Sequence, residues 1–381
     1  MLPGLRYTPR LADILSIALF LCLYVKFKSK QIIRSCARHV LGFKKMRKGL
    51  YILSAIVVMV VSVGCGGAGL RSARITMTTE QSGQVSFRLS GSGTATVDWG
   101  DGSERVSLTL NENGVEFRHT YPNATMRTIL INGDNITGLS VGSGIRLTSL
   151  DVSRNTVLTS LDVSGSGLTS LDVSRNTALT SLRVSRIQFT SLDVSRNTAL
   201  TNLYVSYNQL TSLDVSRNTV LTNLNLQNNQ LTSLDVSRNT ALTHLNVGNN
   251  QLTSLDVSRN TVLTNLNLQN NQLTSLDVSR NTALAHLNAY NNQLTNLDVS
   301  RNTALMSLRI QNNLFSENTL CTILSSLPIQ NPHHPYPLVS IGGNPGAQRM
   351  FEQRFSEWSW SMFYHFIGCG GRVTQEWRVF R

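Results

Sequence analysis

The sequence has few groups arranged for catalysis. Its 381 residues include five cysteines and seven histidines, and none of them stands in a nucleophile motif. Cys321 and Cys369 share the C-terminal stretch with three histidines, but a thiolate nucleophile needs a base within hydrogen-bond reach. Outside the cytoplasm the two cysteines can equally form a disulfide. We therefore predict that the protein is not an enzyme and has no cofactor.

A basic excess is missing from most of the chain, although the net charge is +13. Residues 1–48 contain eleven Lys or Arg and one Asp, so the rest of the chain carries only +3. A nucleic-acid-binding surface gathers its basic residues on the folded domain itself. We therefore predict no nucleic-acid partner.

Long hydrophobic runs are absent as well. The run Ile14–Val25 is shorter than the roughly 20 apolar residues that span a bilayer. A second run, Leu50–Val61, follows a cluster of basic residues and ends four residues before Cys65. This order of basic, apolar and small residues resembles a bacterial lipoprotein signal peptide, whose cysteine becomes the lipidated first residue of the mature chain.

The resemblance to a signal peptide divides the N-terminus. Because Met46 stands where such a signal starts, we predict that residues 1–45 are an upstream extension and that residues 46–64 are the signal peptide. The glycine-rich residues 65–73 would then be a tether. The resemblance implies a lipid on Cys65 and a lipid-anchored place in the bacterial cell envelope, at the outer membrane. Surface exposure stays open, because no acidic run follows the cysteine. The alternative is a membrane-embedded N-terminus.

Residues 74–135 alternate apolar and polar side chains in short runs separated by Gly and Asn, which favours a small all-β sandwich. The motifs WGDG at 99–102 and HTY at 119–121 resemble the PKD domain, an immunoglobulin-like sandwich. Asp98 and Asp101 do not have the spacing of a calcium loop, so we expect them to stabilise turns. Placed before the repeats described next, this module is expected to cover their open end.

A 21-residue pattern recurs through the middle of the chain. The copy that begins at Leu200 reads LTNLYVSYNQ followed by LTSLDVSRNTV. A period of about 20 to 29 residues with this spacing of leucine and asparagine is the leucine-rich-repeat signature, in which stacked coils share one apolar core. We predict a solenoid of nine coils over residues 136–315. The copies begin at Ile136, Leu158, Leu179, Leu200, Leu221, Leu242, Leu263, Leu284 and Leu305.

One half of each unit must form the strand. The half that begins at Leu200 varies between copies, and its Leu203 and Val205 alternate with polar residues, so we place a parallel strand there. An asparagine follows each strand and is predicted to form a ladder that bonds the backbone at the turn. Two early copies have Ser166 and Ile187 at this place. The ladder consists of Asn208, Asn229, Asn250, Asn271, Asn292 and Asn313.

The nearly invariant return half carries a ladder of aspartates, each followed three residues later by an arginine. It runs from Asp151 and Arg154 to Asp298 and Arg301. Like charges would stack at about 4.8 Å in adjacent coils. We expect the two ladders to form ion pairs on a solvated surface; the alternative is a basic stripe that binds an anionic partner.

The far end of the solenoid needs a cover too. Ser316 is predicted to cap a helix that Pro328 ends, and residues 339–341 are predicted to add a last strand. Residues 316–346 are therefore the expected C-terminal cap. Residues 347–381 have no assigned fold beyond an aromatic, helical stretch.

Residues 136–315 resemble internalin-type bacterial leucine-rich-repeat proteins, and the domain order resembles surface lipoproteins that join a PKD-like module to such repeats. This resemblance implies protein binding or adhesion, including host interaction, through the concave sheet. The alternative is a glycan-binding or envelope-scaffolding lipoprotein, because Asn, Tyr and His surfaces also suit sugar hydroxyls.

Aromatic and arginine side chains are the usual anchors of interfaces. Arg183 and Arg186, with Tyr204 and Tyr207 on the next coil, form the densest such patch on the predicted concave face. Two histidines on this face lie two coils, or roughly 10 Å, apart, too far for one metal ion, and we predict no metal site. The candidate ligand-binding residues are Arg183, Arg186, Tyr204, Tyr207, His244, His286, Tyr290 and Arg309.

Overall fold

The computed structural model describes residues 75–142, 144–327, 338–347, 364–365 and 376–380. The chain divides into two compact units, Met1–Ala68 and Gly69–Arg381, and the described residues all belong to the second. The predicted extension, signal peptide and tether, with Cys65, lie outside the described residues, as does the predicted helical stretch of the tail. In the described part of the chain, no helix has the length and apolarity needed to cross a bilayer.

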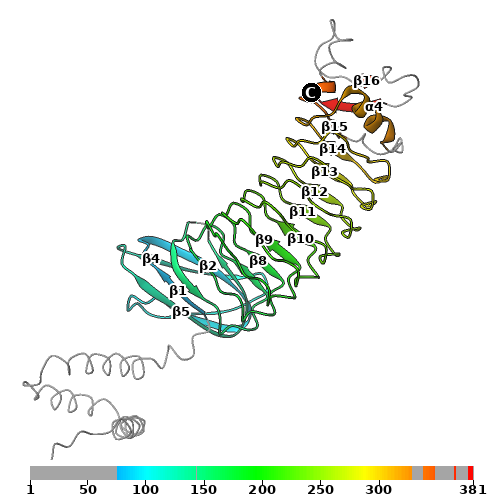
Figure 1. Cartoon of the computed structure of the whole chain (residues 1–381). Helices are drawn as coiled ribbons and strands as arrows, with labels where there is room; N and C mark the ends of the chain where they lie inside the picture. Colours follow the sequence, from blue (N-terminus) through cyan, green and yellow to red (C-terminus); the bar gives the residue numbers. More distant parts are fainter. Residues whose placement is uncertain (1–74, 143, 328–337, 348–363, 366–375, 381) are drawn as a thin grey trace, which may run out of the picture. The chain divides into compact units, whose positions relative to one another are not determined.

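Short parallel strands, one per repeat, form the middle of the chain (Figure 1). Adjacent strands pair in register, so that Leu203 lies beside Leu224 and Leu224 beside Leu245. The strands fall in the variable half of the repeat, as predicted, and they make a leucine-rich-repeat solenoid of eight turns with three-residue strands. The strands are β7 (Ser160–Asp162), β8 (Ser181–Arg183), β9 (Asn202–Tyr204), β10 (Asn223–Asn225), β11 (His244–Asn246), β12 (Asn265–Asn267), β13 (His286–Asn288) and β14 (Ser307–Arg309).

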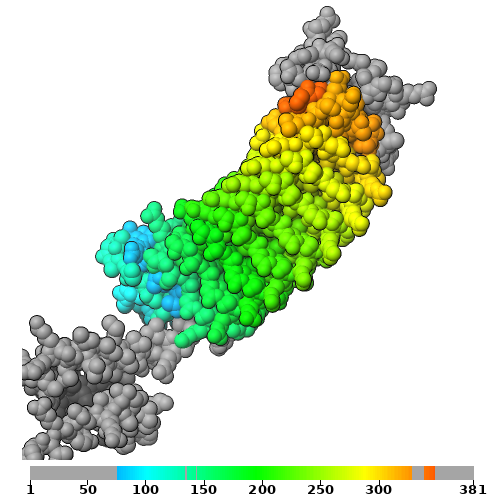
Figure 2. Space-filling model, in the orientation of Figure 1, coloured from blue at the N-terminus to red at the C-terminus, as the bar shows by residue number. Residues whose placement is uncertain are grey.

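The core of the solenoid consists of apolar columns. Leu203 in the strand and Val205 just after it are fully buried, and so are Leu210 and Val215 in the return half. Full burial of such a side chain contributes roughly 1.5–3 kcal/mol relative to exposure. Because each column is shared by neighbouring coils, a single coil has no core of its own. The coils, green to yellow in Figure 2, accordingly form one continuous surface.

The predicted asparagine ladder is confirmed. The Nδ2 of Asn208 donates to the carbonyl of Val184 in the preceding coil at 2.8 Å and to that of Val205 at 3.1 Å. Its Oδ1 accepts from the amide of Phe189 at 3.0 Å. The same bonds recur up to Asn313, and Asn344 in the C-terminal cap adds a further rung.

A second asparagine column, which was not predicted, runs through the return half. Asn197 is fully buried, and its Nδ2 donates to the carbonyls of Val173 and Asn176 in the preceding coil, both at 2.9 Å. The Oδ1 atoms of this column have no hydrogen-bond partner among the described residues. The column therefore connects neighbouring coils in the return half, where no strand is present to pair them. It consists of Asn155, Asn176, Asn197, Asn218, Asn239, Asn260, Asn281 and Asn302.

Antiparallel strands precede the coils. β1 (Ile75–Thr79) pairs with β5 (Arg127–Val141), and β2 (Gly83–Asp98) pairs with β3, β4 and β5. β5 then continues into the solenoid, because its residues 138–140 pair in parallel with β7. The end of β5 thus takes the place of a strand in the irregular first copy, and β5 crosses the predicted boundary at residue 135 between the module and the repeats. The remaining strands are β3 (Val106–Thr109), β4 (Val115–Tyr121) and β6 (Leu147–Asp151).

The predicted helix and last strand are present at the C-terminal end. Helix α4 (Glu317–Ser326) begins after Ser316, whose Oγ accepts from the Thr319 amide at 3.2 Å. β15 (Leu338–Ser340) continues the parallel row after β14. Two further strands follow, β16 (Tyr364–His365) and β17 (Glu376–Phe380), and β17 pairs with both β15 and β16.

The second asparagine column predicts a stability cost. The Nδ2 of Asn239 donates to the carbonyls of Val215 and Asn218, both at 2.9 Å. Replacing Asn239 with Ala leaves both buried carbonyls without this donor, so we expect a loss of about 2–3 kcal/mol in the free energy of unfolding, measured by urea denaturation. Gln230→Ala, at an exposed position, is the control and should change it by less than about 0.5 kcal/mol. Equal effects of the two substitutions would contradict the assignment.

Candidate functional site

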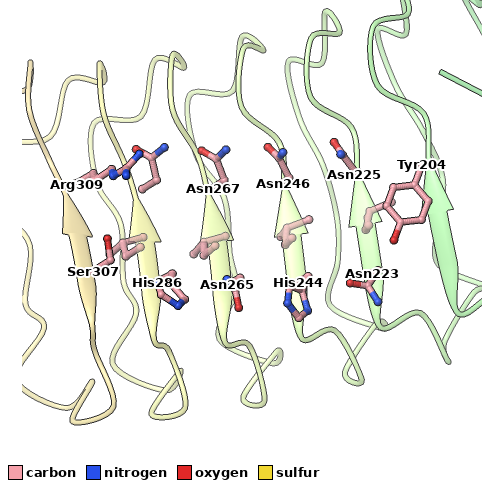
Figure 3. A pocket seen from close by; sticks show the side chains of 15 residues that line it. Tyr204, Asn223, Asn225, His244, Asn246, Asn265, Asn267, His286, Ser307 and Arg309 are labelled. Atoms are coloured by element: carbon pink, nitrogen blue, oxygen red, sulfur yellow. The ribbon is translucent and has the colours of Figure 1, made fainter. Parts of the chain in front are cut away.

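The strands present one polar face to solvent. In β8 to β14 the middle residue of each strand is buried, while the first and third are intermediate or exposed. We call the side chains at these first and third positions the strand face. A groove of about 480 Å³ runs along it from Tyr204 to Arg309. Figure 3 shows the groove side chains in two rows, one from each strand position.

The predicted ligand-binding residues occupy two kinds of position. Those on the strand face itself are Arg183, Tyr204, His244, His286 and Arg309. Arg186, Tyr207 and Tyr290 instead lie in the turn that follows the strand. The structure pairs each of the two arginines at 183 and 186 with a tyrosine of the next coil. It separates the two histidines by Asn265 of β12.

Two arginine–tyrosine stacks join neighbouring coils. The guanidinium carbon of Arg183 lies 4.1 Å from the centroid of the Tyr204 ring, and that of Arg186 lies 5.1 Å from the Tyr207 ring. Such cation–π contacts hold flat side chains in place. The predicted patch of four residues is therefore a contiguous, ordered surface, and Tyr207 remains 48% exposed on it.

The second stack has an unusual backbone. Arg186 and Tyr207 adopt positive φ angles of 59° and 56°. This left-handed conformation disfavours most side chains but suits asparagine. The corresponding positions in the following coils hold asparagine. Arg186 and Tyr207 therefore differ from the repeat at positions where any residue less tolerant of this conformation costs stability. Those positions are Asn228, Asn249, Asn270, Asn291 and Asn312, with φ between 51° and 56°.

Amide side chains make up more than half of the polar residues that line the groove. Asn223 Nδ2 donates to Asn202 Oδ1 at 2.9 Å, and Asn288 Nδ2 donates to Gln269 Oε1 at 2.9 Å. Asn223, Asn265 and Ser307 line the groove but were not predicted. Their position in the column of His244 and His286 was the signal that could have identified them.

The aspartate ladder does not form the expected ion pairs. The Oδ1 of Asp214 accepts from the backbone amide of Ser216 at 2.8 Å, and the same turn occurs in the other coils. From Asp172 to Arg301, all of which the structure describes, no aspartate–arginine pair lies within 4 Å. The amide and hydroxyl of Ser216, more than the charge of Arg217, hold the pKa of Asp214 below its usual value. Each aspartate carboxylate accepts its hydrogen bond from a serine in its own turn and not from an arginine. The prediction of paired ladders was therefore wrong.

The WGDG and HTY motifs meet in one cluster. Asp98 Oδ1 accepts from the Gly100 amide at 3.1 Å, and Asp101 Oδ1 accepts from the Ser103 amide at 3.0 Å. The expected turn-stabilising role of both aspartates is confirmed. Asp101 Oδ2 also lies 2.7 Å from His119 Nε2. Burial, aided by the charge of Asp101, raises the pKa of Tyr121 to about 12, and its hydroxyl donates to the Trp99 carbonyl at 2.7 Å.

Among the described residues, no group of three or more His, Cys, Asp or Glu side chains is placed to hold a metal ion. Cys321, in the middle of helix α4, is disulfide-bonded.

No family model matches the chain, and no curated protein does. Solved structures do: the functional domain of InlJ from Listeria monocytogenes, which includes a cysteine ladder, is 33% identical with a TM-score of 0.48. The match covers 58% of this chain and 52% of that domain, about half its length. The internalin InlF from L. monocytogenes is 20% identical with a TM-score of 0.32, over 55% of this chain and 81% of that one. A leucine-rich-repeat protein from Leptospira interrogans is 18% identical with a TM-score of 0.34, over 53% and 72%.

The Asp101 cluster predicts a pH dependence. Bonds from the Ser103 hydroxyl and amide, together with His119, hold the pKa of Asp101 well below its usual value. A carboxylate with a depressed pKa stabilises the fold above about pH 4, and this contribution is lost as the pH falls further. We expect Asp101→Asn to lower the thermal unfolding midpoint at about pH 6, and the difference from the unaltered protein to shrink towards about pH 2. Glu104→Gln in the same loop is the control, and a difference that does not depend on pH would refute the assignment.

Proposed function

We propose that this is a non-enzymatic protein of the bacterial cell envelope that binds another protein through its strand face, in adhesion or host interaction. The observation that carries the proposal is the patch of Arg183, Arg186, Tyr204 and Tyr207. Arg186 and Tyr207 stand where the later coils place asparagine, in a conformation that asparagine tolerates better. Side chains kept against a conformational cost are characteristic of functional sites.

The chemistry of the patch suits a protein partner. Tyrosine and arginine are enriched among the residues that dominate binding energy. Tyrosine buries a large area with only two rotatable side-chain bonds. The stacks at 4.1 and 5.1 Å fix both rings before a ligand arrives. A preorganised surface loses less conformational entropy on binding.

The envelope location rests on the N-terminal sequence. The basic and apolar order before Cys65 supports lipidation of that cysteine, and the module with the WGDG motif is proposed to be PKD-like. Intact-mass measurement on protein from membranes of the native host tests the anchor. We expect a chain that begins at a diacylated Cys65, and a shift in mass when lipoprotein processing is blocked. A chain that retains residues 1–45 without lipid would contradict it.

A neutral glycan is the second candidate ligand. The amide groups of the groove, such as Asn225, Asn246 and Asn267, can donate to and accept from sugar hydroxyls. Competition by free oligosaccharides against a bound protein ligand would distinguish this candidate from the first.

Tyr207→Asn is the sharpest test of the protein-binding surface. It installs the residue that the following coil carries at the same φ, so the free energy of unfolding should stay equal or rise. Binding to partners identified in an array of extracellular proteins should weaken by at least about tenfold, as for an interface anchor. Gln251→Ala, at an exposed position two coils away, should leave binding unchanged. Unchanged binding by Tyr207→Asn would exclude this patch as the contact.

A further inference from the structure

The carboxylates and the binding face are separated in this solenoid. From β8 to β14, a stretch that is described throughout, the strands and the turns that follow them carry no Asp or Glu. The acidic residues of these coils all sit in the return half, where each aspartate is bound to the serine amide two residues on. The strand face therefore offers positive and neutral groups only.

Its cations stand at the two ends. Arg183 and Arg186 lie at the β8 end, and Arg309 lies six strands away on β14, roughly 29 Å at the usual strand spacing. Between them the groove is lined by amides and by the imidazoles of His244 and His286 (Figure 3). The titratable or charged side chains that line the groove are Tyr204, His244, His286 and Arg309.

We infer that the groove takes an acidic, extended segment of the partner, whose carboxylates meet Arg309 and the two histidines, and that it binds this segment more tightly as the pH falls. This inference rests on the proposed function and names the chemistry of its ligand. About nine residues of extended chain reach from one end of the face to the other.

Proton uptake supplies the pH dependence. Histidine is the side chain that ordinarily changes its charge between about pH 5 and 8. Asn223 and Asn265 flank His244 in its column, and Asn265 and Ser307 flank His286. None of these neighbours carries a charge, so the added protons face the groove and not a carboxylate of the protein. Arg309 of β14 is the only permanently charged side chain among the described residues that line the groove.

A short poly-L-glutamate peptide is the probe, with poly-L-lysine as its control, titrated against the full chain. We expect poly-L-glutamate to bind roughly two- to tenfold more tightly at about pH 5.5 than at about pH 7.5, the gain of two partly exposed charge pairs. His244→Asn with His286→Asn should remove this difference. Both changes install a residue that neighbouring coils already carry in the same column, so the fold should tolerate them.

A gain of function provides the complementary test. Asn265→His places a third imidazole between the existing two, at a position where both adjacent coils already hold histidine, and should steepen the pH dependence. Arg309→Asn, which matches Asn288 in the preceding coil, should weaken binding at both pH values. A pH difference that survives the double histidine substitution, or one that Asn265→His leaves unchanged, would overturn the inference.

Tyr207→Asn separates this inference from the proposed function. Tyr207 does not line the groove, so its replacement should spare binding of poly-L-glutamate while weakening binding of the protein partner. If the unaltered chain ignores poly-L-glutamate but Tyr207→Asn still loses the partner, the acidic-segment inference fails and the proposed function stands. If Tyr207→Asn keeps the partner while the histidine variants behave as expected, the groove binds the acidic segment and the patch around Tyr207 is excluded as part of the contact.

Discussion

The structure depends on amide side chains that complete the backbone of the preceding coil. A three-residue strand satisfies few backbone groups, and the carbonyls of buried residues such as Val184 and Val205 lie just beyond it. Asn208 and Asn197 each donate to two buried carbonyls, one or both of them in the preceding coil. A buried carbonyl without a donor costs free energy, so from Asn208 onward the fold requires one asparagine in each half of the repeat. This requirement also explains the C-terminal cap, where Asn344 supplies the rung that the last coil needs.

The positions of the candidate residues could be predicted because the 21-residue period separates two kinds of variation. Positions that repeat without change serve the stacking, and positions that vary on one side of an identified strand face solvent. Once Leu203 and Val205 were assigned inward, Tyr204 had to point outward. The contact between Arg183 and Tyr204 then followed from register alone. What sequence could not supply was the left-handed backbone at Tyr207, since the turn is defined by bonds such as its amide to the Gln227 carbonyl at 2.9 Å.

The errors have equally local causes. The return-half column of Asn197 went unnoticed because an asparagine between a charged residue and a threonine looks like an ordinary surface turn. The aspartate ladder was expected to pair with arginine because the spacing of three residues brings them close. Within the coil, however, the serine amide two residues after each aspartate is nearer and needs an acceptor. The hydrogen bond within the turn therefore takes the place of the ion pair with the arginine three residues on.

Because neighbouring coils are nearly interchangeable, the length of the strand face can change in units of one repeat. A coil inserted between β12 and β13 would meet the same strand leucine and asparagine columns on both sides. It would move Arg309 away from Arg183 by one strand spacing, about 4.8 Å. Neither end of the face would change. The number of 21-residue coils therefore sets the length of the strand face, independently of the residues at its two ends.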